Sequence, residues 1–297
     1  MIKYPFKLLV RVFRSLYFLF FLNGFLLASL FYFKTEANYE NKLFSVIQKS
    51  IDKEIDANDT KDSVLIKIMQ TCSKLLYSRS TVFGGNAKDL EGFQMNFLHP
   101  ASIDLMTANG ACGSYSLVLA RILQNYHFPV RIDQMKANGK FASHNIIEAN
   151  INSKWIVLDP LYDVYFVKPN STGLASFEDV KNNWNYYSKQ LPKGYDTSYR
   201  YEAVRYTNWN KIPVIFPAFK KILDIVLGKE KADTICLRVH FLKMYDLYFY
   251  IVLFLYIPIL LLTFRKIIKK KLFTKYNTPI TVRNIKKYIK PRFESAN

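Results

Sequence analysis

The sequence contains little cysteine and histidine, and it lacks the common nucleotide-binding motifs. Its three cysteines cannot all pair, so the chain is not a scaffold held together by disulfides. Two of its four histidines, His99 and His240, have no companions at metal-ligand spacing, so no metal site is expected. The glycine-rich patterns that bind phosphates and dinucleotides are absent, and so are internal repeats. The sequence therefore predicts no metal and no other cofactor.

Charge is missing from two long apolar stretches, at 15–33 and 247–264. Each has about the 18–20 residues that a helix needs to cross the hydrocarbon core of a bilayer, so both are predicted to be transmembrane helices. A cleaved signal peptide is the alternative for the first stretch. That stretch is longer than the usual apolar region of a signal peptide, and no clear small-x-small cleavage site follows it, which favours an uncleaved anchor.

Acidic residues are outnumbered by basic residues, 23 to 42, and the excess is concentrated at the two ends. Segment 1–14 carries +4 and segment 265–297 carries +10 of the formal net charge of +19. The positive-inside rule then places both termini in the cytoplasm and domain 34–246 outside it, in the periplasm if the host is bacterial. A tail that binds RNA is the alternative, but attraction to anionic membrane lipid is favoured and no nucleic acid is expected.

The domain between the spans has mixed helical and strand periodicity. Apolar residues recur at helical spacing around Cys72, which is predicted to lie in the core rather than in a disulfide with Cys236. Segment 80–108 is predicted to be loop with room for one short helix. Helices are predicted at about 40–56, 61–79, 114–124, 176–190 and 218–228, and strands at about 128–134, 142–149 and 154–158. The last helix has one apolar face, which either lies on the membrane surface or packs on the domain.

The two adjacent strands bring an imidazole and a carboxylate together. If segment 150–153 is a symmetric four-residue loop, His144 lies directly opposite Asp159. Directly opposed side chains project from the same face of a sheet with Cβ atoms about 5 Å apart, so Asp159 can accept a hydrogen bond from the His144 ring. The register predicts a base and a carboxylate that orients it.

Cys112 supplies a candidate nucleophile. It lies between Gly110 and Gly113, at the predicted start of a helix. A helix N-terminus and a neighbouring imidazolium both stabilise a thiolate, and the flanking glycines allow a tight turn and close approach of a substrate. Sulfur, imidazole and carboxylate together can attack an amide or ester carbonyl, and no other pattern in the chain indicates comparable chemistry.

These residues resemble the transglutaminase-like superfamily in three blocks, which cover about a fifth of the chain. The blocks are Gly110–Ser116 followed by a helix and Pro129-Val130-Arg131, then His144 with Glu148, then Trp155–Pro160. The resemblance implies a papain-like α+β domain, with helices packed on an antiparallel sheet between the two spans. It also implies that Cys112 is the nucleophile, His144 the general base and acid, and Asp159 the orienting residue.

The resemblance implies acyl transfer or hydrolysis at peptide-type amides, without naming the acceptor. Location outside the cytoplasm suggests peptide-bearing cell-envelope polymers or neighbouring proteins as substrates. A non-catalytic peptide-binding scaffold of a membrane complex and an arylamine-acetyltransferase-like thioester enzyme are the alternatives. His127-Phe128 departs from the glycine that usually precedes the family's Pro-x-Arg strand. No second oxyanion donor is evident in the sequence, and Gln94 and Asn109 are the candidates.

Overall fold

The computed structural model describes residue 12 and residues 15–84 and 92–276, which divide into two units. The described part of the first unit consists of residues up to Tyr32 and from Phe249 onwards, and the second unit is Phe33–Tyr248. Nearly all of the predicted cytoplasmic segment 1–14, and the tail from residue 277 onwards, lie outside the described residues.

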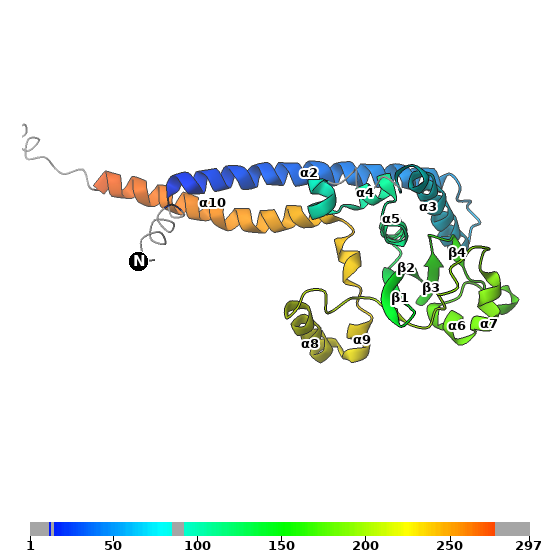
Figure 1. Cartoon of the computed structure of the whole chain (residues 1–297). Coiled ribbons are helices and arrows are strands. Elements are labelled where there is room, and N and C mark those ends of the chain that lie inside the picture. The colour runs from blue at the N-terminus through cyan, green and yellow to red at the C-terminus, as the bar shows by residue number, and fades with distance from the viewer. Residues whose placement is uncertain (1–11, 13–14, 85–91, 277–297) are drawn as a thin grey trace, which may run out of the picture. The chain divides into compact units, whose positions relative to one another are not determined.

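The first unit consists of parts of two long helices, α2 (Leu16–Asp52) and α10 (Met244–Tyr276) (Figure 1). Both are long and apolar enough to cross a membrane. Within the unit, Asn23 Nδ2 donates a hydrogen bond to Thr263 Oγ1 over 2.8 Å. Small polar contacts of this kind join helices in lipid, where water does not compete for the groups.

The helix predicted at about 40–56 is the continuation of the first apolar stretch, and it ends at Asp52. The sequence changes from apolar to polar after Phe33, but it contains no Pro or Gly there that would end a helix. A change in polarity alters the surroundings of a helix without interrupting its backbone, so one helix replaces the two predicted segments.

The second unit contains the α+β domain. Its longer helices, in chain order, are α3 (Lys61–Phe83), α4 (Ala101–Thr107), α5 (Cys112–Asn125) and α8 (Ile215–Leu227). Its shorter helices and turns are η2 (Gln94–Leu98), η3 (Pro169–Ser171), α6 (Phe177–Asn182), α7 (Trp184–Tyr187), η4 (Ser188–Gln190), α9 (Lys229–Asp233) and η5 (Leu237–Phe241). Its strands are β1 (Val130–Ala137), β2 (Lys140–Ile151), β3 (Lys154–Asp159), β4 (Val164–Tyr165) and β5 (Val204–Arg205).

The five strands form one antiparallel sheet in the order β4-β3-β2-β1-β5. The α+β class with an antiparallel sheet is therefore confirmed, together with two helices of membrane length. The structure adds two short edge strands, and α4 is a short helix of the kind that segment 80–108 was predicted to have room for.

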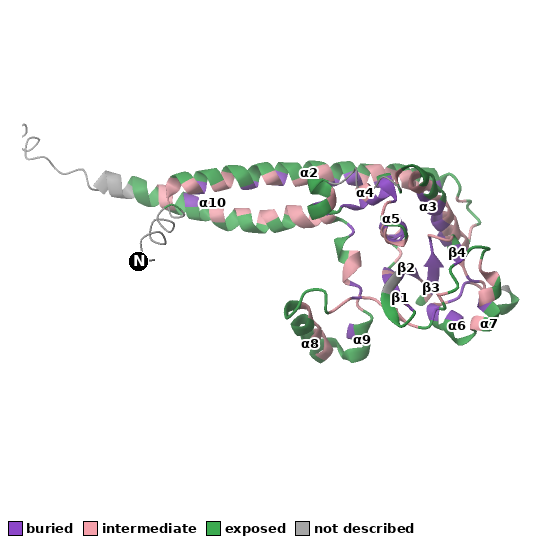
Figure 2. Ribbon diagram, in the orientation of Figure 1, coloured by how far each residue is buried: buried purple, intermediate pink, exposed green. Residues whose placement is uncertain are grey.

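Each face of the sheet has its own apolar core. On one face, α5 and α3 pack against alternating strand residues such as Ile132, Ile147 and Leu158. On the other face, Ile146 and Val157 pack under the segment that contains α6 and α7. Figure 2 shows β3 as largely buried. A sheet covered on both faces needs apolar residues in both alternating positions, which explains the near-continuous apolar sequence of β3.

All three cysteines are free. Cys72 is fully buried in the core beneath α5, where its apolar stripe predicted it to lie. Burial raises the pKa of the Cys72 thiol, because the apolar surroundings disfavour its charged form. Cys236 is also buried, while Cys112 is partly exposed. Of the three thiols, only Cys112 is accessible to a reagent or a substrate.

Candidate active site

Cys112 is the first residue of α5. The preceding residue, Ala111, has φ 44° and ψ −123°, a backbone conformation that residues with a Cβ rarely adopt. The turn places the thiol at the N-terminus of a fourteen-residue helix, where the peptide groups carry partial positive charge. Backbone strain of this kind persists only where the surrounding contacts hold it.

Those contacts come from the first turn of α5. Gly110 N donates to Ser114 Oγ over 2.7 Å, and Ser114 Oγ donates to the buried Asp104 Oδ1 over 2.5 Å. A Cβ at Gly110 would lie only 2.8 Å from Ser114 Oγ, so this position requires glycine because of close approach. The expectation that both glycines supply the tight turn is corrected, because the positive φ belongs to Ala111 and a Cβ at Gly113 would meet no close atom.

His144 and Asp159 form a buried pair. The His144 Nε2 and Asp159 Oδ2 atoms are 2.7 Å apart, and the two side chains are 1% and 0% exposed. Because Asp159 engages Nε2, Nδ1 is the ring atom left to face Cys112. Pairing between a carboxylate and one ring nitrogen fixes the tautomer and the orientation of an imidazole.

The register that produces this pair differs from the predicted one. The β2–β3 turn consists of only two residues, Asn152 and Ser153, both with positive φ, so Ile151 rather than Ala149 faces Lys154. Two-residue turns with positive φ are favoured in hairpins because they match the twist of the strands. Continuing the observed pairing places Asp159 opposite Ile146 rather than opposite His144.

The prediction survives this error because the shift is two residues. A shift of one residue moves a side chain to the other face of the sheet, whereas a shift of two keeps it on the same face. His144 and Asp159 are therefore diagonal neighbours, within reach of each other's side chains. An irregularity in the β1–β2 pairing just before His144 bends the strand at that point, as bulges beside functional sites do.

Three tyrosines surround the pair. The Tyr199 ring stacks on the His144 ring at 4.5 Å with an interplanar angle of 10°, and Tyr162 lies 5.7 Å away. The Tyr195 hydroxyl donates to Asp159 Oδ2 over 3.4 Å. These rings exclude water from the pair and strengthen its electrostatic attraction. No pattern in the sequence indicates these contacts, because segment 162–209 is rich in aromatic residues without clear periodicity.

Asn145, the neighbour of His144, is a further site residue that sequence reasoning missed. Its Nδ2 donates to Cys112 Sγ over 3.5 Å. Its Oδ1 accepts a hydrogen bond from Arg238 Nη1 over 2.7 Å. Since arginine has donors only, Arg238 requires the carbonyl oxygen of Asn145 on its side and so turns the NH₂ group toward the sulfur. Gln94 and Asn109 were the sequence candidates for such a donor, and Asn145 is the residue that contacts the thiol.

The contacts shift two pKa values in opposite directions. Burial raises the pKa of the Cys112 thiol, but hydrogen bonds to His144 and Asn145 and the charge of His144 outweigh burial, so that pKa lies below its ordinary value. Burial lowers the pKa of His144, but its hydrogen bonds to Asp159 and Cys112 outweigh that effect and raise the pKa to about 9. Both shifts are in the direction that favours a thiolate beside an imidazolium over the neutral pair.

A second polar cluster lies on the same sheet. Arg131 Nη2 contacts Glu148 Oε2 at 2.7 Å, and its guanidinium lies 3.8 Å from the centre of the Trp155 ring and 4.3 Å from that of Tyr206. Glu148 is only 3% exposed, so its carboxylate is shielded from water. Burial and the nearby Glu148 raise the pKa of Asp133 well above its ordinary value.

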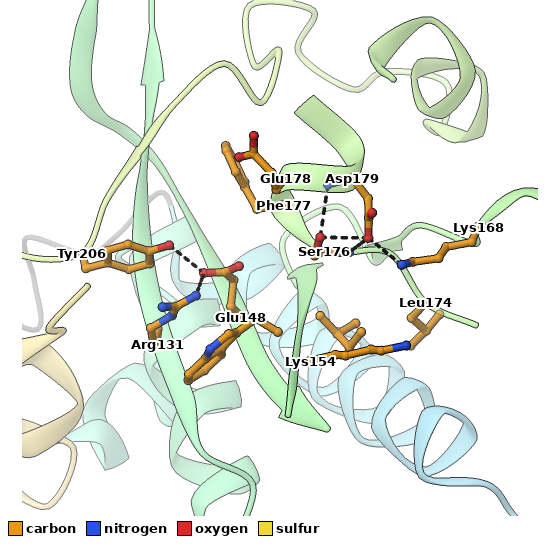
Figure 3. A pocket seen from close by; sticks show the side chains of 12 residues that line it. Arg131, Glu148, Lys154, Lys168, Leu174, Ser176, Phe177, Glu178, Asp179 and Tyr206 are labelled. Carbon is orange, nitrogen blue, oxygen red and sulfur yellow. Dashed lines mark hydrogen bonds and ion pairs between the residues drawn. The ribbon is translucent and has the colours of Figure 1, made fainter. Parts of the chain in front are cut away.

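This cluster borders a cavity of about 440 Å³, shown in Figure 3. Lys154 and Leu174 line the cavity, and Ser176 and Asp179 lie at the start of the helix that closes one side. The lining comprises none of Cys112, His144 and Asp159. The cavity is therefore a feature separate from the thiol site.

Within residues 12, 15–84 and 92–276, no group of three or more His, Cys, Asp or Glu side chains is placed to hold a metal ion. Comparisons with protein-family models, with curated proteins and with solved structures find no match for this chain. The geometry of the site is thus the basis for any statement about function.

Proposed function

We propose that this chain is a membrane-anchored thiol enzyme that transfers or hydrolyses acyl groups at peptide-type amides. One observation carries the proposal: the partly exposed Cys112 begins a helix and accepts a hydrogen bond from Asn145, and the ring of the preceding residue, His144, is bound to a buried carboxylate at 2.7 Å. Charged or titratable groups with shifted pKa values, gathered around one accessible nucleophile, are typical of catalytic sites.

In the first step, the Cys112 thiolate attacks the carbonyl carbon of the substrate and forms a C–S bond. The carbonyl electron pair moves to oxygen and gives a tetrahedral oxyanion. When the C–N bond breaks, His144 Nδ1–H donates its proton to the leaving amine, and a thioester remains on Cys112. Asp159 stays ionised and keeps the ring oriented toward the sulfur.

In the second step, water or a second amine attacks the thioester. Neutral His144 removes a proton from this acceptor, and the thiolate leaves with the electron pair of the C–S bond. Water gives hydrolysis and an amine gives transamidation, so the same three residues serve both outcomes.

Asn145 is proposed as an oxyanion donor. When a carbonyl carbon is bonded to Cys112 Sγ, its oxygen lies close to the Asn145 NH₂ group, which faces the sulfur at 3.5 Å. The backbone N–H of Cys112 is a second donor, because the first N–H groups of a helix have no partner within the helix. Preorganised donors aimed at the developing charge contribute much of the catalysis in acyl transfer. Arg238 is a positioning residue, because it acts through Asn145.

The proposal includes a transglutaminase-like, papain-like domain that faces the outside of the cytoplasm. The fold part is supported by α5 beginning at the thiol and by His144 and Asp159 on neighbouring antiparallel strands. The location is supported by the basic excess at both ends of the chain. Peptide-bearing cell-envelope polymers and neighbouring proteins are the proposed substrates.

Alkylation of the full-length chain by iodoacetamide tests the thiol. We expect Cys112 to react in the folded protein well below pH 8.5, the ordinary pKa of a thiol, and p-nitrophenyl acetate to give a burst of nitrophenolate as Cys112 is acylated. Cys112→Ala should abolish both signals and leave the fold intact. A thiol that stays inert until the protein is denatured would rule out the enzyme and favour the peptide-binding scaffold.

Reporter fusions test the location. A reporter fused after Asn297 should be active only in the cytoplasm, and one inserted near residue 190 only outside it. The reverse pattern would overturn the orientation and leave the chemistry of the thiol unaffected.

A further inference from the structure

Helix α8 exposes a continuous apolar stripe. None of its thirteen residues is buried. Ile215, Phe219, Ile222 and Val226 follow one another at intervals of four, three and four residues, and their exposed fractions are 65%, 43%, 57% and 71%. Ile225, which is 78% exposed, borders them. These five residues form the α8 stripe, since such spacing places side chains on one side of a helix.

The opposite side of α8 is the one that contacts the protein. Lys220 forms ion pairs with Asp224 and with Asp233 of α9, the latter at 3.0 Å. On the flank between that side and the stripe, the Trp209 ring lies 6.5 Å from Phe216 and 6.2 Å from Phe219, the least exposed residue of the stripe. These contacts fix the rotation of the helix, so the stripe is held outward rather than exposed by chance.

Water is an unfavourable partner for this surface. Exposing an apolar area costs about 25 cal/mol per Å², and contiguous apolar patches on soluble domains mark binding surfaces. A helix with an apolar stripe, a charged opposite side and flanking lysines is typical of helices that lie in the interface of a bilayer. Segment 211–231 contains five lysines against two acidic residues, which suits a surface of anionic headgroups.

The chain itself brings α8 to a membrane. Only residues 228–243 separate the end of α8 from α10, one of the two helices of membrane length. Sixteen residues span at most about 55 Å when fully extended, and this segment also contains the helical α9 and η5. Tethering at this distance keeps the effective concentration of α8 at the bilayer high.

We propose that α8 lies in the interface of the same bilayer that α2 and α10 cross, with the α8 stripe among the acyl chains. The other lysines of segment 211–231 then lie among the phosphates of the headgroups, while Lys220 keeps its ion pairs with Asp224 and Asp233. The helix is a third point of attachment that does not cross the membrane, and it restricts the rotation of the domain about its two anchors. This inference is independent of the chemistry proposed for Cys112.

Photo-crosslinking of the purified full-length chain in vesicles of phosphatidylcholine and phosphatidylglycerol tests the proposal. Benzoylphenylalanine replaces Ile222 in the stripe or, as the matched control, its neighbour Lys221. Replacement of the exposed Phe254 in α10 calibrates the yield for a residue in lipid. We expect lipid adducts at Ile222 in a yield comparable to that at Phe254 and at least about fivefold above that at Lys221.

Adduct masses distinguish the outcomes. A lipid mass on the peptide that contains Ile222 supports the proposal. A crosslink to a second copy of the chain would identify the stripe as a protein interface, and equal or absent lipid labelling at Ile222 and Lys221 would show that the stripe avoids the bilayer. Either result overturns the inference and leaves the Cys112 assays as they were.

Discussion

Two buried ion pairs on neighbouring strands have nearly the same geometry, but one is proposed to take part in catalysis and the other to stabilise the fold. His144–Asp159 and Arg131–Glu148 each have a nitrogen–oxygen distance of 2.7 Å, and His144 and Glu148 lie on the same face of β2. The first pair includes an imidazole and adjoins a partly exposed thiol. The second includes a guanidinium enclosed by two aromatic rings.

A buried ion pair can take part in catalysis when a nucleophile lies beside it and when one of its members can exchange a proton. An imidazole can gain and lose a proton near neutral pH, whereas a guanidinium stays charged and serves as a structural cation. If this distinction holds, damage to the first pair should remove reactivity, whereas damage to the second should lower stability and leave reactivity unchanged.

Asp159→Asn gives the largest expected effect on the reactive pair. The amide keeps the shape of the carboxylate but no longer stabilises the imidazolium, and it allows the wrong tautomer. We expect steady-state turnover of p-nitrophenyl acetate to fall by about 10³–10⁴-fold, as in other nucleophile–His–Asp sites. Asn at this position should keep the fold but lower the stability at neutral pH, because the buried imidazolium loses its counter-charge. Normal turnover in the variant would show that Asp159 has only a structural role.

Arg131→Met should lower the stability of the fold and leave the reactivity of the thiol unchanged. The apolar side chain fills the space between the rings but leaves Glu148 and Asp133 buried without their cation. Removing one partner of a buried pair typically costs about 3–5 kcal/mol of folding free energy, which denaturant unfolding measures. The rate of Cys112 alkylation in the folded state should not change. Lys181→Met, which removes an exposed pair with Glu178, is the control and should leave stability unaltered.

Asn145→Asp tests whether the amide beside the thiol donates a hydrogen bond during the reaction. A carboxylate still accepts the hydrogen bond from Arg238, but it has no N–H to offer the sulfur or an oxyanion. We expect turnover of p-nitrophenyl acetate to fall by about 10²–10³-fold, and alkylation of Cys112 to require a higher pH.

The control for this change is Asn152→Asp in the β2–β3 turn, where the new carboxylate can still accept the hydrogen bond from Lys61. Turnover should be normal in this control. An Asn145→Asp variant with normal turnover and a normal alkylation profile would remove Asn145 from the proposed oxyanion site.

The sequence predicted the parts of this arrangement that depend on local order. Alternation along β2 and β3 was enough to place His144 and Asp159 on one face, and the prediction tolerated a wrong turn length because the error was an even number of residues. The start of α5 at Cys112 followed from the glycines and the apolar spacing that comes after them. The α+β class followed from the same local patterns.

Contacts between distant segments could not be predicted in this way. Arg238 lies 93 positions from Asn145, and its segment η5 is short and has no apolar period. Tyr199 belongs to irregular chain, so no periodicity indicates that its ring stacks on His144. Burial of Glu148 depends equally on Tyr206, which comes from another part of the chain. Each case needs three-dimensional packing rather than local pattern.

The smallest expected effect is a dependence on pH that only the reactive pair should have. The pKa of His144 is raised to about 9, above the ordinary value of about 6.5, so the folded state binds the imidazolium proton more tightly than the unfolded state does. The stabilisation from this proton is fully present below about pH 6.5 and is lost as the pH rises through about 9.

The lowered pKa of Cys112 acts in the opposite direction, so the contribution of His144 is measured as the difference in unfolding free energy between the wild type and His144→Gln from pH 6 to 10. This difference should be largest below about pH 6.5 and should shrink as the pH rises through about 9. Turnover should rise as the Cys112 thiolate forms, below the ordinary thiol pKa, and fall near pH 9 as His144 loses the proton that it donates. In Arg131→Met the stability should be lower by a similar amount at every pH in this range, because a guanidinium remains charged throughout it. A difference between the wild type and His144→Gln that does not change between pH 6.5 and 10 would contradict the coupling of His144 to Asp159 and Cys112, and with it the contrast between the two pairs.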